Sequence, residues 1–208
     1  LKNEQKKNLL SEILKNLKNS KIIFKDKSVE EKEIVFEDKN DIDQYLSKNP
    51  VHMIKSSIKK IINQGKTILC VGPMSKNCVD AAIELSDYHN IYIFLIASRR
   101  QVDSQKFGGG YVNNWSTKEF SKYVKNKCKR KKIILARDHG GPWQNFQDYK
   151  NKISLKKAIN NAKYAFKDDI DNGFKFLHLD TSVSPHLKKV KTNDAIKRLK
   201  DIYSYLSK

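Results

Sequence analysis

The sequence predicts an α/β fold built on a parallel sheet, and three observations support this prediction. Short apolar runs alternate with segments whose apolar residues recur at helical spacing, and four such strand–helix units follow Pro50. The strand segments are almost continuously apolar, as is typical of parallel strands that helices cover on both faces. Polar residues collect directly after these strands, at the edge of the sheet where α/β proteins bind their ligands.

The first two units are bounded by clear stop signals. Their expected elements are a helix over 53–63 that ends at Gly65, a strand over 67–71 that ends at Gly72-Pro73, a helix over 76–88 and a strand over 91–97. Glycine favours helix ends because it adopts the left-handed conformation at little cost. The second helix places Val79, Ala82 and Ile83 on one face, so we expect that face to cover the sheet.

The last two units are marked equally well. Ser116 and Glu119 form a capping box, which predicts the start of a helix at Thr117. The remaining expected elements are a strand over 132–136, a long helix from Ser154 that Gly173 closes, a strand over 174–179 and a helix over 194–206. On the last strand, Phe174, Phe176, His178 and Asp180 share one face by alternation. We therefore expect His178 and Asp180 to point away from the helices.

Residues 1–50 are predicted to form an N-terminal helical appendage, and residues 51–208 the (β/α) domain. A complete (β/α)8 barrel needs eight units and about 250 residues, so this domain is a partial or half barrel. The rest of the barrel lies outside the chain, or two halves associate, or the sheet stays open and the appendage covers an edge. The chain opens with Leu1 rather than Met, which is compatible with a piece of a longer polypeptide.

The composition limits the classes of protein to which this chain can belong. The 42 Lys and Arg residues exceed the 23 acidic residues and give a net charge of +19, so binding to a polyanion is one hypothesis. The basic segment 122–132 shows no Arg-rich, aromatic-interleaved or helix-turn-helix pattern, which argues against nucleic acid. Three cysteines without a CxxC pair indicate a reducing compartment, and no apolar run is long enough for a membrane span. We therefore expect a cytoplasmic protein.

Candidate functional residues follow the third and fourth strands. Asp138 can move a proton, and the adjacent His139 can bind a divalent metal, for which zinc is the natural candidate. His178 is a second candidate metal ligand. The alternative is that the Asp-His pair only caps a turn and that His178 is a hydrogen-bonded core residue.

Arginine is scarce in this lysine-rich chain, and three of its five arginines follow strands. Arg99, Arg100 and Arg137 are therefore expected to bind a phosphate or carboxylate, because arginine provides a planar pair of donors. The alternative is that one or two of them pair with Asp103, Asp138 or Asp180. The backbone of Gly109 and Gly110 can approach a ligand at this edge.

The segment 66–182 resembles the GatZ/KbaZ-type accessory subunits of class II D-tagatose-1,6-bisphosphate aldolase. The motifs that carry the resemblance are Gln101-Val102, Phe107-Gly108-Gly109-Gly110-Tyr111, Ile133 to Gln144 with Asp138-His139-Gly140-Gly141-Pro142 at its centre, and His178-Leu179-Asp180-Thr181-Ser182. The family pattern has a glycine at the position of Arg137, and a small polar pair at Arg99-Arg100. The additional cations indicate a more anionic ligand.

The resemblance implies a TIM barrel, a role in carbohydrate metabolism and a class II aldolase site in which zinc polarises a sugar-phosphate carbonyl. Asp138 then corresponds to the catalytic, proton-transferring carboxylate and His139 to a metal ligand, and His178 stays the second candidate ligand from its place on the strand. The substrate-binding residues are expected to be Arg99, Arg100, Gln101, Gly109, Gly110, Arg137, Asp180 and Ser182.

Three functions are compatible with these residues. The first is a metal-dependent lyase of the aldolase type, or a related sugar isomerase, that binds an anionic sugar phosphate. The second is a non-catalytic, stabilising subunit that works as an oligomer or with a catalytic partner subunit. The third is a basic protein whose charge binds a polyanion or nucleic acid.

Overall fold

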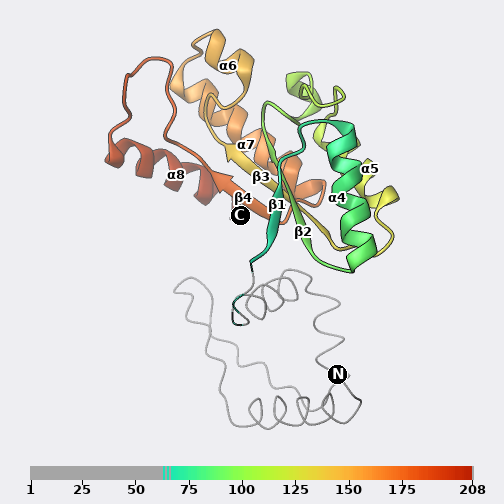
Figure 1. Ribbon diagram of the computed structural model, residues 1–208. Helices are drawn as coiled ribbons and strands as arrows, with labels where there is room; N and C mark the ends of the chain where they lie inside the picture. Colours follow the sequence, from blue (N-terminus) through green and yellow to red (C-terminus); the bar gives the residue numbers. More distant parts are fainter. Residues whose placement is uncertain (1–62, 64, 66, 208) are drawn as a thin grey trace. The chain divides into compact units, whose positions relative to one another are not determined.

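A computed structural model describes residues 63, 65 and 67–207. Its centre is one sheet of four parallel strands, shown in Figure 1. They are β1 (Leu69–Val71), β2 (Ile93–Ser98), β3 (Ile133–Gly140) and β4 (Phe176–Leu179), and their order in the sheet is their order in the chain. The predicted α/β fold with a parallel sheet is confirmed. The strand order does not reverse, unlike that of a doubly wound fold, and agrees with part of a (β/α) barrel.

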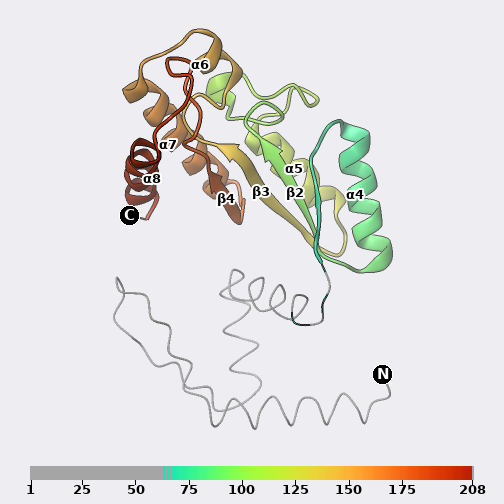
Figure 2. The same ribbon diagram turned by 60° about the vertical axis from the view of Figure 1, so that its left-hand side comes forward.

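Helices connect successive strands, as Figure 2 shows from a second side. They are α4 (Lys76–His89), the 3-10 helix η1 (Gln105–Phe107), α5 (Thr117–Lys127), α6 (Phe146–Lys150) and α7 (Leu155–Asp171). A further helix, α8 (Thr192–Leu206), follows β4. The helices expected from residues 76, 117 and 154 are confirmed to within one residue at their starts. Ser116 and Ser154 cap α5 and α7, and the capping box between Ser116 and Glu119 is formed on both sides.

The strand register assigns each strand residue to one of two faces. Leu95 pairs with Leu135, and Ala97 with Arg137, so these side chains point to the same face of the sheet. On the opposite face, Phe94 pairs with Ile134, and Ser98 pairs with Asp138. Phe176 lies on this opposite face too, because it pairs with Ala136 and contacts Phe94 with ring centroids 5.0 Å apart.

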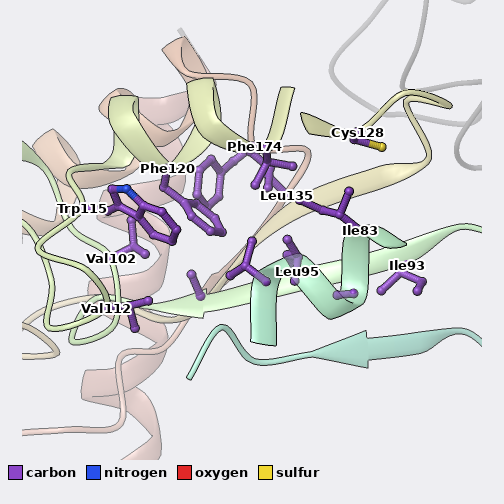
Figure 3. Packing of buried hydrophobic residues seen from close by; sticks show 14 residues of the cluster. Ile83, Ile93, Leu95, Val102, Val112, Trp115, Phe120, Cys128, Leu135 and Phe174 are labelled. Carbon is purple, nitrogen blue, oxygen red and sulfur yellow. The ribbon is translucent and has the colours of Figure 1, made fainter. Parts of the chain in front are cut away.

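The main hydrophobic core lies between the sheet and helices α4 and α5 (Figure 3). Ile83 and Phe120 from the helices pack against Leu95 and Leu135 from the strands, and all four side chains are buried. Phe174 belongs to this core. We expected it on the opposite face with Phe176, and this was wrong because β4 begins only at Phe176, so strand alternation does not reach residue 174.

A second core cluster joins α7 and α8 to the same side of the sheet. Phe166 of α7 and Ile202 of α8 are buried, and Leu177 and Leu179 of β4 pack against them. The described helices α4, α5, α7 and α8 therefore cover one face, whereas we expected helices on both. The reason is topological: each right-handed crossover steps to the next strand in the same direction, so the helices fall on the same side.

The expected appendage over 1–50 and the expected helix over 53–63 lie outside the described residues, apart from residue 63. Within the part of the chain that the structure describes, no helix combines the length and the apolar character needed to cross a bilayer.

Candidate metal centre

Asp138 and His139 lie at the carboxyl end of β3, within the strand rather than after it. Adjacent residues of a regular strand point to opposite faces. Here the pairing of β3 with β4 shifts register between Arg137 and Gly140, and His139 has a left-handed backbone with φ of 43°. This irregularity turns both side chains towards the same place. The positive φ costs about 1–2 kcal/mol in a residue with a Cβ, so the site contains local backbone strain.

His178 joins this pair from β4. It lies two residues after Phe176, on the face that points away from the helices, as the sequence predicted. Its Nδ1 atom is 3.1 Å from Asp138 Oδ1, and the ring centroids of His178 and His139 are 5.7 Å apart. The structure therefore brings together the predicted catalytic carboxylate and both predicted metal ligands, although 39 residues separate His139 from His178 along the chain.

Asp180 fixes the orientation of the His139 ring. Its Oδ2 atom lies 3.0 Å from His139 Nδ1 and accepts a hydrogen bond of 2.6 Å from Gln144 Nε2. Its Oδ1 atom accepts hydrogen bonds from the backbone and the hydroxyl of Ser182. Asp180 is buried, whereas His139 and His178 are exposed. We expected Asp180 and Ser182 to bind substrate. In the structure, Ser182 binds Asp180, and Asp180 binds His139.

The donor set is suitable for a divalent metal of the zinc type. One donor atom from each of Asp138, His139 and His178 lies within 4.8 Å of the others. A tetrahedral zinc site places its donors about 3.4 Å apart, so small side-chain rotations bring the three into range. The contact with Asp180 uses His139 Nδ1 and leaves Nε2 for the metal, which is the carboxylate–histidine–metal arrangement common in zinc proteins.

The charges around His139 and Asp180 favour the ionised forms of both. The hydrogen bond that His139 donates to Asp180, with the nearby Asp138 charge, raises the pKa of His139 above its ordinary value, although burial and the Arg100 charge oppose this. Burial acts to raise the pKa of Asp180, but hydrogen bonds from Ser182 and His139 outweigh it and lower that pKa. The two groups therefore form an ion pair when no metal competes with the proton.

Two glycines allow close packing beside this centre. A Cβ on Gly140 would overlap the Phe166 ring of α7, and one on Gly141 would overlap the carbonyl oxygen of Asp180. Gly141 also has φ of 154°. Both glycines are therefore required by space, and Gly141 lets Asp180 lie against the end of β3.

Arg137 does not reach this centre. It lies on the helix side of β3, is 2% exposed, and binds Asp169 of α7 through two hydrogen bonds of 2.8 and 2.6 Å. It also donates to the carbonyls of Ala97 and Val102. The geometry thus gives Arg137 a structural role. We expected it to bind substrate because it follows the predicted strand 132–136, but the observed strand continues through it and alternation points it inward.

Arg99 is also held inside the protein. It is 1% exposed, its Nε atom lies 3.1 Å from Asp103 Oδ2, and its Nη1 atom donates to the carbonyl of Gly141. The pairing with Asp103 is the alternative that the sequence left open. Through Gly141, Arg99 connects the end of β2 to the chain that directly follows β3.

Gln101, Gly109 and Gly110 likewise make contacts within the protein. Gln101 Oε1 accepts from the backbone of Ser98, and the amides of Gly109 and Gly110 donate to Ser104 and Trp115. These amides are not available to a phosphate in the described structure. Arg100 differs from the other predicted cations because it is exposed, and its charge is felt by His139.

Sequence reasoning gave no role to Arg198 of α8. Its Nη1 atom lies 3.4 Å from the carbonyl of Thr181 and 3.3 Å from that of Val183, and its guanidinium stacks over the Trp143 ring. It thereby fixes the chain that follows Asp180. The scarcity of arginine in this chain was the available signal, since Arg198 is one of only five.

The fold and site define a class of protein: a parallel (β/α) domain with acidic and histidine side chains at the carboxyl ends of its strands. The family model of the D-tagatose-1,6-bisphosphate aldolase subunit GatZ/KbaZ-like proteins matches residues 52–199. The chain therefore belongs to the GatZ/KbaZ-like family, a family of carbohydrate metabolism.

Among solved structures, a probable tagatose 6 phosphate kinase from Sinorhizobium meliloti 1021 is similar, with a TM-score of 0.56 and 20% sequence identity. The match covers 67% of this chain and 36% of that one, so this chain spans about a third of the length of its relative. At this identity the likeness shows the fold alone. A search of curated proteins found no match.

Proposed function

We propose that this chain is a divalent-metal domain of the class II aldolase type, which binds an anionic sugar phosphate as part of a larger aldolase assembly. The observation that carries the proposal is the convergence of Asp138, His139 and His178, with Asp180 behind His139. Family membership supports the sugar-phosphate class of ligand and the presence of a partner subunit.

In this proposal His139 and His178 hold the metal, and Asp138 accepts or returns a proton. When bound, zinc supplies a Lewis acid that polarises a carbonyl and stabilises the adjacent negative charge. Asp138 is suited to proton transfer because it is partly exposed and lies against His178. Asp180 and Ser182 keep the His139 ring in one orientation, and Arg100 supplies positive charge at the mouth of the site.

A non-catalytic stabilising subunit is the second candidate function. It is favoured by the four described strands, which make half of the eight that a complete barrel contains. In this case the same residues bind metal and ligand, but turnover requires residues from a partner subunit. Polyanion binding has less support, because Arg99, Arg137 and Arg198 are all buried in pairing or stacking contacts.

The experiment is thermal unfolding of the chain with zinc, with D-tagatose 1,6-bisphosphate, and with both, using inorganic phosphate as the control ligand. A ligand at about 100 times its dissociation constant stabilises the chain by about 2.7 kcal/mol. The proposal requires a zinc-dependent shift with the sugar that is lost in His139→Ala. His89→Ala is the matched control, since His89 is an exposed histidine at the end of α4. Equal shifts with sugar and inorganic phosphate would exclude an enclosed sugar site in this chain.

The role of Asp138 is separated by a second measurement. If Asp138 carries the proton, the Asp138→Asn variant keeps its zinc affinity within about threefold but abolishes cleavage by the assembled enzyme. A loss of zinc affinity of about tenfold or more would instead make Asp138 a metal ligand. If the variant binds zinc and sugar and the assembled enzyme still cleaves, the stabilising role is the correct one. Binding that weakens steeply between low and moderate salt would favour polyanion binding.

A further inference from the structure

A cleft of about 430 Å³ lies beside the candidate metal centre. One wall comes from the chain between β2 and α5, including Arg100 and Tyr111, and the other from the start of α6, including Phe146 and Gln147. The cleft and the metal centre lie at the same edge of the sheet, because one wall follows β3, which carries Asp138 and His139, and the other follows the neighbouring strand β2. Ser98 of β2 is in register with Asp138, and Arg100 is only two residues beyond Ser98.

Two aromatic side chains on these walls are exposed. Tyr111 is 58% exposed and Phe146 is 53% exposed, whereas Trp115 and Trp143 are buried. Within the described residues, Tyr111 makes one weak side-chain hydrogen bond, to the sulfur of Met74 at 3.8 Å. Aromatic surface in a concave site gains free energy when a ligand covers it, and binding clefts are typically lined in this way.

The polar groups of the cleft divide into two sets. Arg99 and Asn145 are both bound to Asp103, so these donors are committed to the protein. The side chains of Arg100 and Gln147 are exposed and make no hydrogen bond or ion pair with the part of the chain that the structure describes. The cleft therefore offers one guanidinium and one amide, both free to bind a ligand, between two aromatic walls.

The charge of the cleft is governed by Arg100. Beneath it, Arg99 is balanced by Asp103 at 3.0 Å and faces Asp148 at 4.0 Å, so this buried group provides no excess positive charge. One terminal nitrogen of Arg99, Nη2, is buried and lacks a hydrogen bond of good geometry. An anionic group in the cleft is thus bound mainly by Arg100.

We propose that this cleft is the subsite for the sugar portion of the ligand, with Tyr111 and Phe146 packed against its C–H surface, Gln147 bound to a hydroxyl and Arg100 paired with a phosphate. The inference rests on the proposed function and adds the residues that select the ligand. A sugar phosphate combines an apolar ring or chain surface, hydroxyls and an anion, which are the three chemistries that the cleft presents. Tyr111 and Phe146 are then specificity-determining residues outside the metal centre.

The test is calorimetric titration of the zinc-loaded chain with D-tagatose 1,6-bisphosphate, D-tagatose and inorganic phosphate. Tyr111→Ala and Phe146→Ala are expected to weaken bisphosphate binding about fivefold each. Arg100→Gln is expected to weaken it about tenfold or more, without changing the affinity for neutral D-tagatose. Tyr203→Ala and Arg130→Gln are matched controls, because both residues are exposed and lie on α8 and after α5, away from the strand ends.

The outcomes separate this inference from the proposed function. If the Tyr111 and Phe146 variants bind the bisphosphate as well as the unaltered chain, but His139→Ala does not, the cleft inference is wrong and the metal centre stands. If binding needs the cleft residues and is independent of zinc and His139, the subsite stands and the metal proposal is wrong. If the unaltered chain binds none of the three probes, both are wrong for this chain. Zinc affinity is measured for every variant, and the Tyr111 and Phe146 variants should leave it unchanged.

Discussion

His139 and Asp180 are joined by a contact of 3.0 Å between Nδ1 and Oδ2, and this contact decides which ring nitrogen of His139 is free. The same carboxylate is held by Gln144 and Ser182, so its position is fixed from two further directions. Asp180→Asn removes the charge and keeps the size. Because such carboxylates orient and strengthen a histidine ligand, we expect zinc affinity to fall about 10- to 100-fold.

Competition between the chain and a chromophoric chelator measures this affinity directly. His89→Ala should leave the zinc affinity unchanged, since His89 ends α4 and has no part in the centre. An Asp180→Asn chain that binds zinc as tightly as the unaltered chain would show that His139 does not depend on Asp180 for its orientation.

The titration of His139 in the metal-free chain gives a second prediction. Its pKa is raised above 6.5, chiefly by the hydrogen bond that its ring donates to Asp180, and the Arg100 charge opposes this rise in part. Asp180→Asn should therefore lower the pKa of His139, and Arg100→Gln should raise it. NMR of the ring protons follows both shifts. A pKa that moves in the same direction in the two variants would contradict the described geometry.

The pKa shifts of His139 and Asp180 determine how this pair contributes to the stability of the chain as the pH changes. The folded pKa of His139 is raised, so its contribution is fully present below about pH 6.5 and is lost as the pH rises through the folded value. The folded pKa of Asp180 is lowered, so its contribution is present above about pH 3.8 and is lost as the pH falls through the folded value. The metal-free pair therefore stabilises the chain most between these limits. The gain is small because His139 is exposed to solvent.

Arg137 gives a prediction about stability rather than binding. Arg137→Met leaves Asp169 buried without its partner, and removing one member of a buried ion pair costs about 3–5 kcal/mol. The double variant Arg137→Met, Asp169→Leu should recover part of this loss because no charge remains unpaired. Urea unfolding measures both variants. Arg100→Gln is the control and should change stability by less than about 0.5 kcal/mol, since Arg100 is exposed.

The glycines after β3 provide a matched pair of substitutions. Gly141→Ala places a Cβ against the carbonyl of Asp180 and is expected to cost about 3 kcal/mol or more. Gly108→Ala has a positive φ of 86° but open space around the added Cβ, so only the backbone cost of about 1 kcal/mol applies. The difference between the two free energies of unfolding isolates the effect of space. Equal losses would mean that β3 and the chain after β4 do not approach as described.

The sequence predicted most of the fold because its signals are local. Capping residues such as Ser116 and Ser154 act within one helical turn, and the helices they start were found where expected. The 3.6-residue and 2-residue periods likewise depend on neighbouring residues. The short helix α6 was not predicted, although Asn145 caps it through hydrogen bonds to Gln147 and Asp148. A five-residue helix is too short for a period to be recognised.

The site was predicted less evenly. Asp138, His139 and His178 were found by their place at strand ends, and the topology does bring them together. The arginines could not be assigned in the same way, because their partners are fixed by packing. Arg137 reaches Asp169, 32 residues away, only when α7 lies on β3. Moving an arginine by one residue along a strand turns it to the other face, so one residue decides whether it faces a ligand or a buried aspartate. Strand ends predicted from sequence are not accurate to one residue, so the face of each arginine could not be assigned.

The shift in register between Arg137 and Gly140 also bears on how this centre can be lost. Two adjacent side chains share one face only because the strand contains an irregular step. A regular strand through this step would turn His139 towards the Phe166 side of the sheet, although every metal-binding residue type stayed in the chain. A comparison of related sequences by residue identity alone would then count the motif as intact. The backbone pairing of this segment is therefore as informative as its letters when relatives are sorted into metal-binding and metal-free forms.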